Sequence, residues 1–381
     1  ITSSAPIVVY QFNVFKNAFS NDASLLLPTP ALGKRYRVVG WPAGHPIKLL
    51  NIIDRAVVTI VGTAPDTTVT VLPRWRIKGN PPIAAAKPGQ QFQVKLGPFD
   101  VLNLETDDAT FQDDIKTMAD LSGSVITSDK PVAVFSGVET TSAPGGVLDI
   151  PTYPGWTDDS TCCLDHLEEQ LFPVESLGAK YVITRSPIRS SGSYHEPDVI
   201  RFVGAAEDSA IVTSLPAPFD KFLLKNGEVR TTWADADFVA TGSKPFLVAQ
   251  LQVSQDYVDG NITGDPSLTI FPAVDQYRDQ YRILTPADAG VWGWQANYVV
   301  LATEPTNVIT LDGVEPAGCV VTPAGNVDGT DYESRRCPVS EGVHALKGKT
   351  PFGVLAYGYG PAGSYAFPGG ADVEPIYAPP Q

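Results

Sequence analysis

The chain has 381 residues, including 34 prolines and 33 glycines, and a formal net charge of −15 at pH 7. Proline and glycine interrupt helix interiors, so long helices are not expected, and residues 113–121 are the best candidate for a short one. The acidic balance argues against nucleic acid as a partner, since phosphates are bound by lysine and arginine, and no apolar run reaches the roughly 18 residues of a membrane-spanning helix.

One sequence pattern occurs three times along the chain. The segments PTPALGKRY (residues 28–36) and PVESLGAKY (residues 173–181) share four identities, and a weaker third copy covers residues 272–281. An apolar run precedes each copy, and each copy ends on a tyrosine that leads into another apolar run: Tyr36, Tyr181 and Tyr281. This arrangement predicts a strand, a turn and a second strand in every copy.

The similarity continues downstream of each copy. Residues 57–71, 199–213 and 298–311 each contain two β-branched runs separated by glycine, proline, aspartate or asparagine, a pattern typical of β-hairpins. A strand introduced by a proline then closes each unit, at Pro131, Pro245 and Pro351, because proline fits the first position of a strand. The predicted fold is therefore all-β, with three related antiparallel β-sandwich-like units forming a pseudo-repeat and few or no helices.

The unit boundaries follow from these copies. We assign residues 1–141 to unit 1, residues 161–262 to unit 2 and residues 263–368 to unit 3. Residues 142–160 are rich in proline and glycine and are interpreted as a link, where limited proteolysis is expected to cut first. Residues 369–381 form an extended tail. The units are expected to pack on one another, because their apolar faces need cover.

The four cysteines fall into two groups. Cys319 and Cys337 lie 18 residues apart around a loop rich in glycine, asparagine and aspartate, and a disulfide there is predicted to add about 3 kcal/mol of stability. Cys162 and Cys163 are adjacent, and three outcomes stay open for them: a bond to each other, free thiols, or a bridge to another chain. No cysteine or histidine spacing indicates a zinc site.

Several segments carry a family resemblance. The run CLDHLEEQLFPVESLGAKY at residues 163–181, preceded by SDKPVAVFSG at residues 128–137, resembles the N-terminal domain of the IgG Fc-binding protein family. Residues 10–12 (YQF) and 21–28 resemble its bacterial members, and residues 264–272 resemble its later segment. The resemblance implies a secreted, non-catalytic binding, adhesive or structural role, and it leaves the ligand of this chain open.

The chain departs from the family pattern at one place. Members commonly carry a cysteine shortly after the VFSG strand, which would pair with the cysteine before Asp-His-Leu. Here Gly137 is followed by VETTS, and a second cysteine stands beside the first. This departure favours a bridge between Cys162 and Cys163.

The densest ionisable cluster consists of His166 with Asp165, Glu168 and Glu169, and catalysis or a metal could use such a group. Asp22 and Asp265 take the place of Asp165 in the other two units, so a structural role at a repeated strand entry is expected. The chain has no Gly-x-Ser-x-Gly, His-Glu-x-x-His or phosphate-loop motif, and GYGPAG at residues 358–363 lacks the following helix that a dinucleotide site needs. We predict no enzymatic activity, no catalytic residue, and no cofactor unless calcium is bound.

Two further groups are candidates for ligand binding. Loop carboxylates suit calcium, which prefers oxygen ligands, although solvated turns are the alternative; the candidates are Asp256, Asp259, Asp328 and Asp331. Trp292 and Trp294 lie two residues apart, so in a strand they share one face. There they pack in the core or, if exposed, stack on a sugar or anchor a protein partner.

Three functions are consistent with these patterns. We favour a secreted or cell-surface binding or adhesion module that recognises a protein or a glycan. The alternatives are a self-assembling subunit of an extracellular fibre, sheath or coat, and an enzyme without a visible site. In self-assembly the first strand would complete a neighbour's sheet edge through Ile7, Val8, Val9 and Tyr10. The chain begins at Ile1 and its single methionine is Met118, which predicts a processed form or an excised region and favours an extracellular or cell-surface location.

Overall fold

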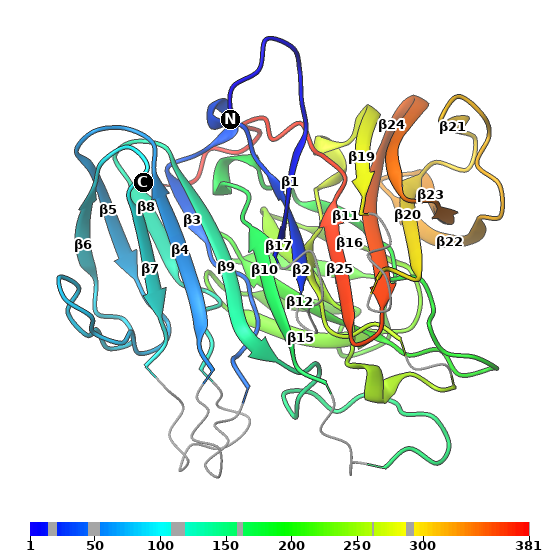
Figure 1. Cartoon of the computed structure of the whole chain (residues 1–381), viewed down its shortest axis with the longest axis horizontal. Coiled ribbons are helices and arrows are strands. Elements are labelled where there is room, and N and C mark those ends of the chain that lie inside the picture. Colours follow the sequence, from blue (N-terminus) through cyan, green and yellow to red (C-terminus); the bar gives the residue numbers. More distant parts are fainter. Residues whose placement is uncertain are drawn as a thin grey trace.

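The computed structural model covers the whole chain, and the structure describes residues 1–13, 21–44, 54–107, 119–157, 163–260, 263–286 and 293–380. These residues form antiparallel sheets, and their only helical elements are four single 3-10 turns (Figure 1). The predicted all-β class is confirmed. The predicted helix at residues 113–121 lies mostly outside the described residues, and its last three residues are not helical. In the described part, no helix has the length and hydropathy that crossing a bilayer requires.

Unit 1 consists of two four-stranded sheets. The first has the strand order β3 (Arg35–Arg37), β8 (Val125–Ser128), β5 (Thr67–Leu72), β6 (Phe92–Leu96). The second has the order β10 (Asp165–Gln170), β9 (Val132–Thr141), β4 (Ala56–Gly62), β7 (Val101–Glu105). Its edge strand β10 comes from residues that the sequence pattern assigned to unit 2. Alternate side chains of β4 are buried, because successive residues of a strand point to opposite faces. Ile60 of β4 and Val69 of β5 share one core, so the sheets form a sandwich.

Unit 2 repeats this arrangement. Its first sheet has the order β11 (Lys180–Ile183), β16 (Phe238–Gly242), β13 (Ser209–Thr213), β14 (Lys221–Leu224). Its second sheet has the order β15 (Val229–Ala234), β12 (Asp198–Gly204), β17 (Phe246–Leu251), β18 (Leu268–Ile270). Its edge strand β18 comes from residues that the sequence pattern assigned to unit 3. The core between them is aromatic, with Phe202, Phe238 and Phe246 fully buried. After β17 the chain makes the 3-10 turn η4 (Gln255–Tyr257).

Unit 3 is built around one long strand. β24 (Gly342–Gly360) pairs through its first half with β19 (Arg278–Thr285) and β21 (Ile309–Leu311), and through its second half with β20 (Ala296–Thr303) and β25 (Gly363–Pro368). β23 (Thr330–Val339) and β22 (Val320–Val327) continue the sheet beyond β20. One strand therefore belongs to both layers of the unit.

Four short strands from different parts of the chain surround the centre of the molecule. They are β2 (Asp22–Leu26), β10, β18 and β25, and we call them the hub strands. β2 packs against β10 and β25, and β18 packs against the same two strands. On its outer side, each hub strand pairs with the strand before it: β1 (Val9–Asn13), β9, β17 and β24. The three units are thereby joined through one common centre.

Three short motifs lie at equivalent places in the units. Each hub strand β2, β10 and β18 is followed by a 3-10 turn: η1 (Thr29–Ala31), η3 (Val174–Ser176) and η5 (Val274–Gln276). Each turn is followed by a buried tyrosine whose hydroxyl donates to the carbonyl of the residue after the strand-initiating proline: Tyr36 to Val132, Tyr181 to Phe246 and Tyr281 to Phe352. The same order of elements and the same tyrosine contact therefore occur at three places among the described residues.

A buried arginine joins units 1 and 2. The Arg201 guanidinium of β12 lies 2.7 Å from the Asp120 carboxylate and 4.9 Å over the ring of Trp41. It also donates to the Ser122 hydroxyl at 2.9 Å. Burial alone would raise the pKa of Asp120, but the Arg201 charge holds that pKa below its ordinary value. The pair is therefore ionised in the folded protein.

Candidate functional site

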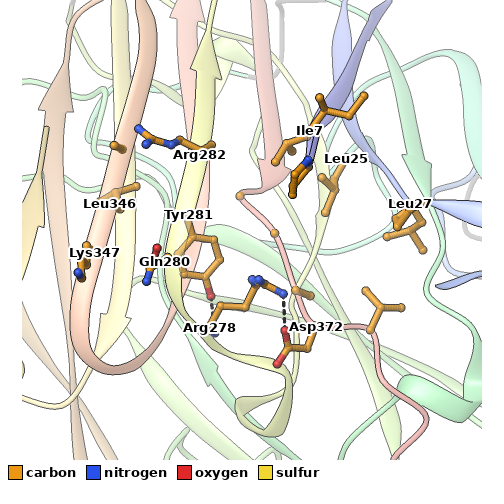
Figure 2. Close-up of a pocket in the computed structure, with 18 of the residues that line it drawn as sticks. Ile7, Leu25, Leu27, Arg278, Gln280, Tyr281, Arg282, Leu346, Lys347 and Asp372 are labelled. Carbon is orange, nitrogen blue, oxygen red and sulfur yellow. Dashed lines mark hydrogen bonds and ion pairs between the residues drawn. The ribbon is translucent and has the colours of Figure 1, made fainter. Parts of the chain in front are cut away.

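A groove of about 650 Å³ opens between the β1–β2 pair and the edge of unit 3 (Figure 2). We call it the junction groove. One wall carries Ile7, Leu25 and Leu27, and the opposite wall consists of β19 and β24 with Tyr281 and Leu346. Residues 369–373 of the C-terminal tail line it as well. Its walls are thus largely apolar.

The junction groove exists because one junction between units is packed differently from the other two. Gly33 faces Pro173, and Gly178 faces Ala273. By the repeated sequence pattern, Arg278 and Pro28 are the equivalent pair at the third junction. In the first two pairs, a Cβ atom on the glycine would lie only 2.3 and 2.5 Å from the facing Cβ atom, so the close packing requires glycine. In the third pair arginine takes the place of glycine, and both members line the groove. The junction between units 3 and 1 therefore stays open.

Three cationic side chains line the junction groove: Arg278, Arg282 and Lys347. Arg278 pairs with Asp372 of the tail (Figure 2). Among the described residues, no carboxylate lies within ion-pair distance of Arg282 or Lys347. The Arg282 charge does act on Asp312, whose pKa is lowered, against the effect of burial, by hydrogen bonds from Ala345 and His344 and by that charge. Because the whole chain has a net charge of −15, the groove is a local cationic region on an acidic protein, and it favours a ligand that carries carboxylates.

Two sheet edges border the junction groove. In the described part of the chain, β1 pairs only with β2, and β19 pairs only with β24. The Tyr10 hydroxyl lies 2.9 Å from the carbonyl oxygens of both Arg282 and Gly369 and can donate to either. Burial raises the pKa of Tyr10, so the hydroxyl keeps its proton. Edge strands present unpaired backbone groups, to which a segment of another chain can bind.

A second candidate, the acidic hub, is buried where the hub strands begin. It consists of Asp22, Asp165 and Asp265, which are each at most 1 % exposed. Loss of hydration raises the pKa of all three carboxyl groups well above the usual range, and the charge of Asp265 raises that of Asp165 further. Asp22 Oδ2 accepts hydrogen bonds from the backbone N–H groups of Glu168 and Leu268, at 3.1 and 3.0 Å. The carboxyl groups thereby connect strands of different units.

The acidic hub is closed to ligands. Asp165 Oδ1 accepts hydrogen bonds from the backbone N–H groups of Asn21 (2.6 Å) and His166 (2.9 Å). The Oδ2 atoms of Asp165 and Asp265 have no hydrogen-bond partner among the described residues. Within the same residues, no group of three or more histidine, cysteine, aspartate or glutamate side chains is arranged to hold a metal ion. The hub has no exposed surface and connects strands, so we assign it to the fold.

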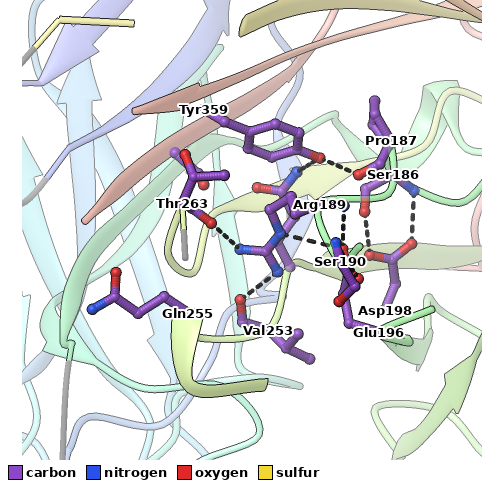
Figure 3. Close-up of polar contacts among 12 residues, drawn as sticks. Ser186, Pro187, Arg189, Ser190, Glu196, Asp198, Val253, Gln255, Thr263 and Tyr359 are labelled. Atoms are coloured by element: carbon purple, nitrogen blue, oxygen red, sulfur yellow. Dashed lines mark hydrogen bonds and ion pairs between the residues drawn. The ribbon is translucent and has the colours of Figure 1, made fainter. Parts of the chain in front are cut away.

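Like the acidic hub, a buried ion pair of unit 2 that contacts unit 3 has a structural role (Figure 3). Arg189 and Glu196 are each 1 % exposed, with Nε 3.5 Å from Oε1. The guanidinium also donates to the Val253 carbonyl at 2.7 Å and lies 5.5 Å from the ring centre of Tyr359. Burial would raise the pKa of Glu196, but the Arg189 charge holds it below the ordinary value. Because these protein groups surround the ion pair and its side chains are buried, a substrate cannot reach it.

The predicted disulfide residues lie at two places. Cys319 and Cys337 are bonded, with an S–S distance of 2.02 Å, and they connect the start of β22 to β23. Cys163 is also disulfide-bonded, while Cys162, its neighbour in the sequence, lies outside the described residues. The Cys319–Cys337 disulfide therefore closes the loop for which the sequence predicted it.

The predicted calcium residues lie in two separate loops, each a candidate by itself. Asp328 forms an ion pair with Lys180 at 2.6 Å, and Asp331 accepts a hydrogen bond from the side chain of Asn326 at 2.7 Å. Asp256 lies within η4, and Asp259 lies just after that turn. The two loops belong to different units.

One candidate ligand-binding tryptophan packs against another ring, whereas the predicted assembly residues lie at the junction groove or in β1. Trp294 is half-buried and contacts the Tyr365 ring edge-on at 4.9 Å, while Trp292 lies outside the described residues. Of the predicted assembly residues, Ile7 and Val8 line the junction groove, and Val9 and Tyr10 begin β1.

The groove cations were missed in the sequence analysis. Arg278 occupies the place of Gly33 and Gly178 in the repeated segment, and this break in the pattern was a visible indication. Arg282 and Lys347 gave no comparable indication, because exposed cations on strands are common. Their position beside Arg278 depends on how β19 pairs with β24.

Comparison with known proteins identifies the family. A family model described as IgGFc binding protein matches residues 22–358. The human (Homo sapiens) IgGFc-binding protein is 25 % identical over 351 residues, which are 91 % of this chain and 6 % of the human protein. A crystal structure of the major pilin from Streptococcus pyogenes covers 88 % of this chain and 97 % of its own, but with 8 % identity and a TM-score of 0.18, it does not relate the two folds. Because the family model covers most of its length, the chain belongs to the IgGFc-binding protein family.

Proposed function

We propose that the chain is a secreted or cell-surface, non-enzymatic module that binds a protein partner in the junction groove. The groove itself carries this proposal, since apolar walls enclose about 650 Å³ and three cations stand around it. Apolar surface with a few placed charges is typical of ligand sites, where the apolar part gives affinity and the charges fix orientation. The bound segment is expected to combine apolar side chains with aspartate or glutamate.

A protein partner fits the junction groove better than a glycan. Sugar rings stack on exposed aromatic faces, but the aromatic residue of the groove wall, Tyr281, is only 5 % exposed. Its hydroxyl is already bonded, to the Arg278 N–H group and to the Phe352 carbonyl. The human relative is named for a protein ligand, the Fc part of IgG. The disulfide suits an extracellular location, where such bonds persist.

Selection of random peptides displayed on phage tests the proposed function. We expect the enriched peptides to carry apolar and acidic residues and to bind Arg282→Glu/Lys347→Glu at least about tenfold more weakly than the wild type, because charge reversal repels their carboxylates. Binding should also weaken as salt is raised. An immunoglobulin Fc fragment is a useful second probe in the same assay.

The matched control is Lys95→Glu/Lys221→Glu. It changes the net charge by the same amount at exposed positions on β6 and β14, outside the groove. Peptides should bind this variant like the wild type at the same ionic strength. Peptides that bind both double variants equally well would place the binding surface elsewhere and overturn the proposal.

A further inference from the structure

The side chain of Phe99 is exposed to solvent in a turn at one end of unit 1. It lies in the turn between β6 and β7, is 88 % exposed, and has a φ of 67°. In a turn that begins with proline, as here at Pro98, a positive φ at the next residue normally calls for glycine. Bulky side chains in this region cost on the order of 1–3 kcal/mol, and such strain is concentrated at functional positions. An exposed aromatic side chain at a strained position therefore needs a role.

The turn around Phe99 is fixed by hydrogen bonds. Asp100 Oδ2 accepts from the Gly97 N–H group at 2.7 Å, and the Phe99 N–H group donates to the Gly62 carbonyl at 2.8 Å. A Cβ atom on Gly62 would lie 2.2 Å from the Gly97 carbonyl oxygen, so the turn rests directly on β4. A partner that binds Phe99 therefore meets a preorganised side chain and loses little conformational entropy.

Apolar and acidic groups surround Phe99. Val101 beside it is 63 % exposed, and Asp100 follows it directly. Exposed carboxylates also occupy the neighbouring turns, at Asp66 and Asp129. The nearby Lys130 ammonium group is engaged by the Pro65 carbonyl. We call residues 98–101 the acidic tip.

We infer that the junction groove of one molecule receives the acidic tip of a second copy of this chain, an inference that rests on the function proposed above. The tip offers the combination that the groove favours, an apolar group with adjacent carboxylates, and Asp100 would meet Arg282 and Lys347, neither of which lies within ion-pair distance of a carboxylate among the described residues. In Figure 1, β6 and β7 lie at one end of the molecule and β19 lies across the hub from them. The contact is therefore formed between copies.

Complementation between two variants tests this inference. Phe99→Gly removes the side chain and relieves the backbone strain, so the variant should fold at least as well as the wild type and still lose self-association. Arg282→Glu/Lys347→Glu keeps the acidic tip and removes the groove charges. We expect light scattering after size exclusion to show wild-type mass rising with concentration, and each variant alone to associate at least about tenfold more weakly. Mixed together, the two variants should form a one-to-one complex, because one supplies a groove and the other a tip.

The outcomes separate this inference from the proposed function. A wild-type protein that stays monomeric at high concentration but still binds selected peptides would overturn the acidic-tip contact and leave the groove as a site for other proteins. Self-association that Phe99→Gly leaves unchanged, or a mixture that forms no complex, would also overturn it. Self-association that responds to Phe99 but not to the groove charges would contradict the groove as the acceptor.

Discussion

The acidic hub should make the protein less stable as pH rises above the usual carboxyl range. Burial raises the pKa of Asp165 and Asp265 well above the ordinary value. At low pH both the folded and unfolded chains are protonated at these groups, so they do not affect stability. Above a pH of about 4 the unfolded chain ionises while the hub keeps its protons. The free energy of unfolding then falls by about 1.4 kcal/mol per pH unit for each retained proton, until the folded pKa is passed.

Asp165→Asn isolates this effect. The asparagine Oδ1 can keep the hydrogen bonds from Asn21 and His166, and its neutral amide removes one titrating proton. The variant should be more stable than the wild type at neutral pH. Above pH 5, and up to the folded pKa of Asp165, its slope should be shallower by about 1.4 kcal/mol per pH unit. Urea unfolding at several pH values, followed by tryptophan fluorescence, measures both quantities.

Burial also raises the pKa of Asp22, Glu169 and Asp198, but these groups are present in both wild type and variant, so the difference between the two slopes reports Asp165. Asp120 and Glu196 have lowered pKa values, so both are ionised in this window whether the chain is folded or not. Asp149→Asn, at an exposed position, is the control and should leave the slope unchanged. If Asp165→Asn has the wild-type slope, or if wild-type stability rises with pH, the hub does not hold protons and the reasoning is wrong.

Three further substitutions test the packing of the units. Gly33→Ala forces a Cβ atom against Pro173 and should lower the free energy of unfolding by about 1–3 kcal/mol. The control is Gly44→Ala, where the added Cβ atom would make only ordinary van der Waals contacts and the free energy of unfolding should change little. Equal urea midpoints for the two variants would refute the close-packed junction. Cys319→Ser opens the disulfide of unit 3 and should cost about 3 kcal/mol, with reduced wild-type protein as the comparison. Arg201→Ala leaves a largely buried carboxylate unpaired and should cost about 3–5 kcal/mol; a thermal midpoint within a degree of the wild type would argue against a buried pair.

Much of the fold could be predicted because it is local and repeated. Prolines before strands, β-branched runs and turn residues recur in register, and the equivalent tyrosines make equivalent bonds. The partner of each hub strand could not be predicted, since a local pattern identifies a strand but not the sheet it joins. For the same reason, the sequence placed Ile7 in an assembly strand without indicating that Lys347 lies across a groove from it.

The hub strands have a consequence for how the chain folds during synthesis. β10 completes a sheet with β9, and β18 completes a sheet with β17, so each of these sheets has an open edge until a later segment has been made. Open edges promote aggregation, and pairings between distant segments slow folding. β9 therefore keeps an open edge until residue 170 has been synthesised, and a fragment that ends at residue 141 would expose that edge. A shortened form that folds should end beyond β10.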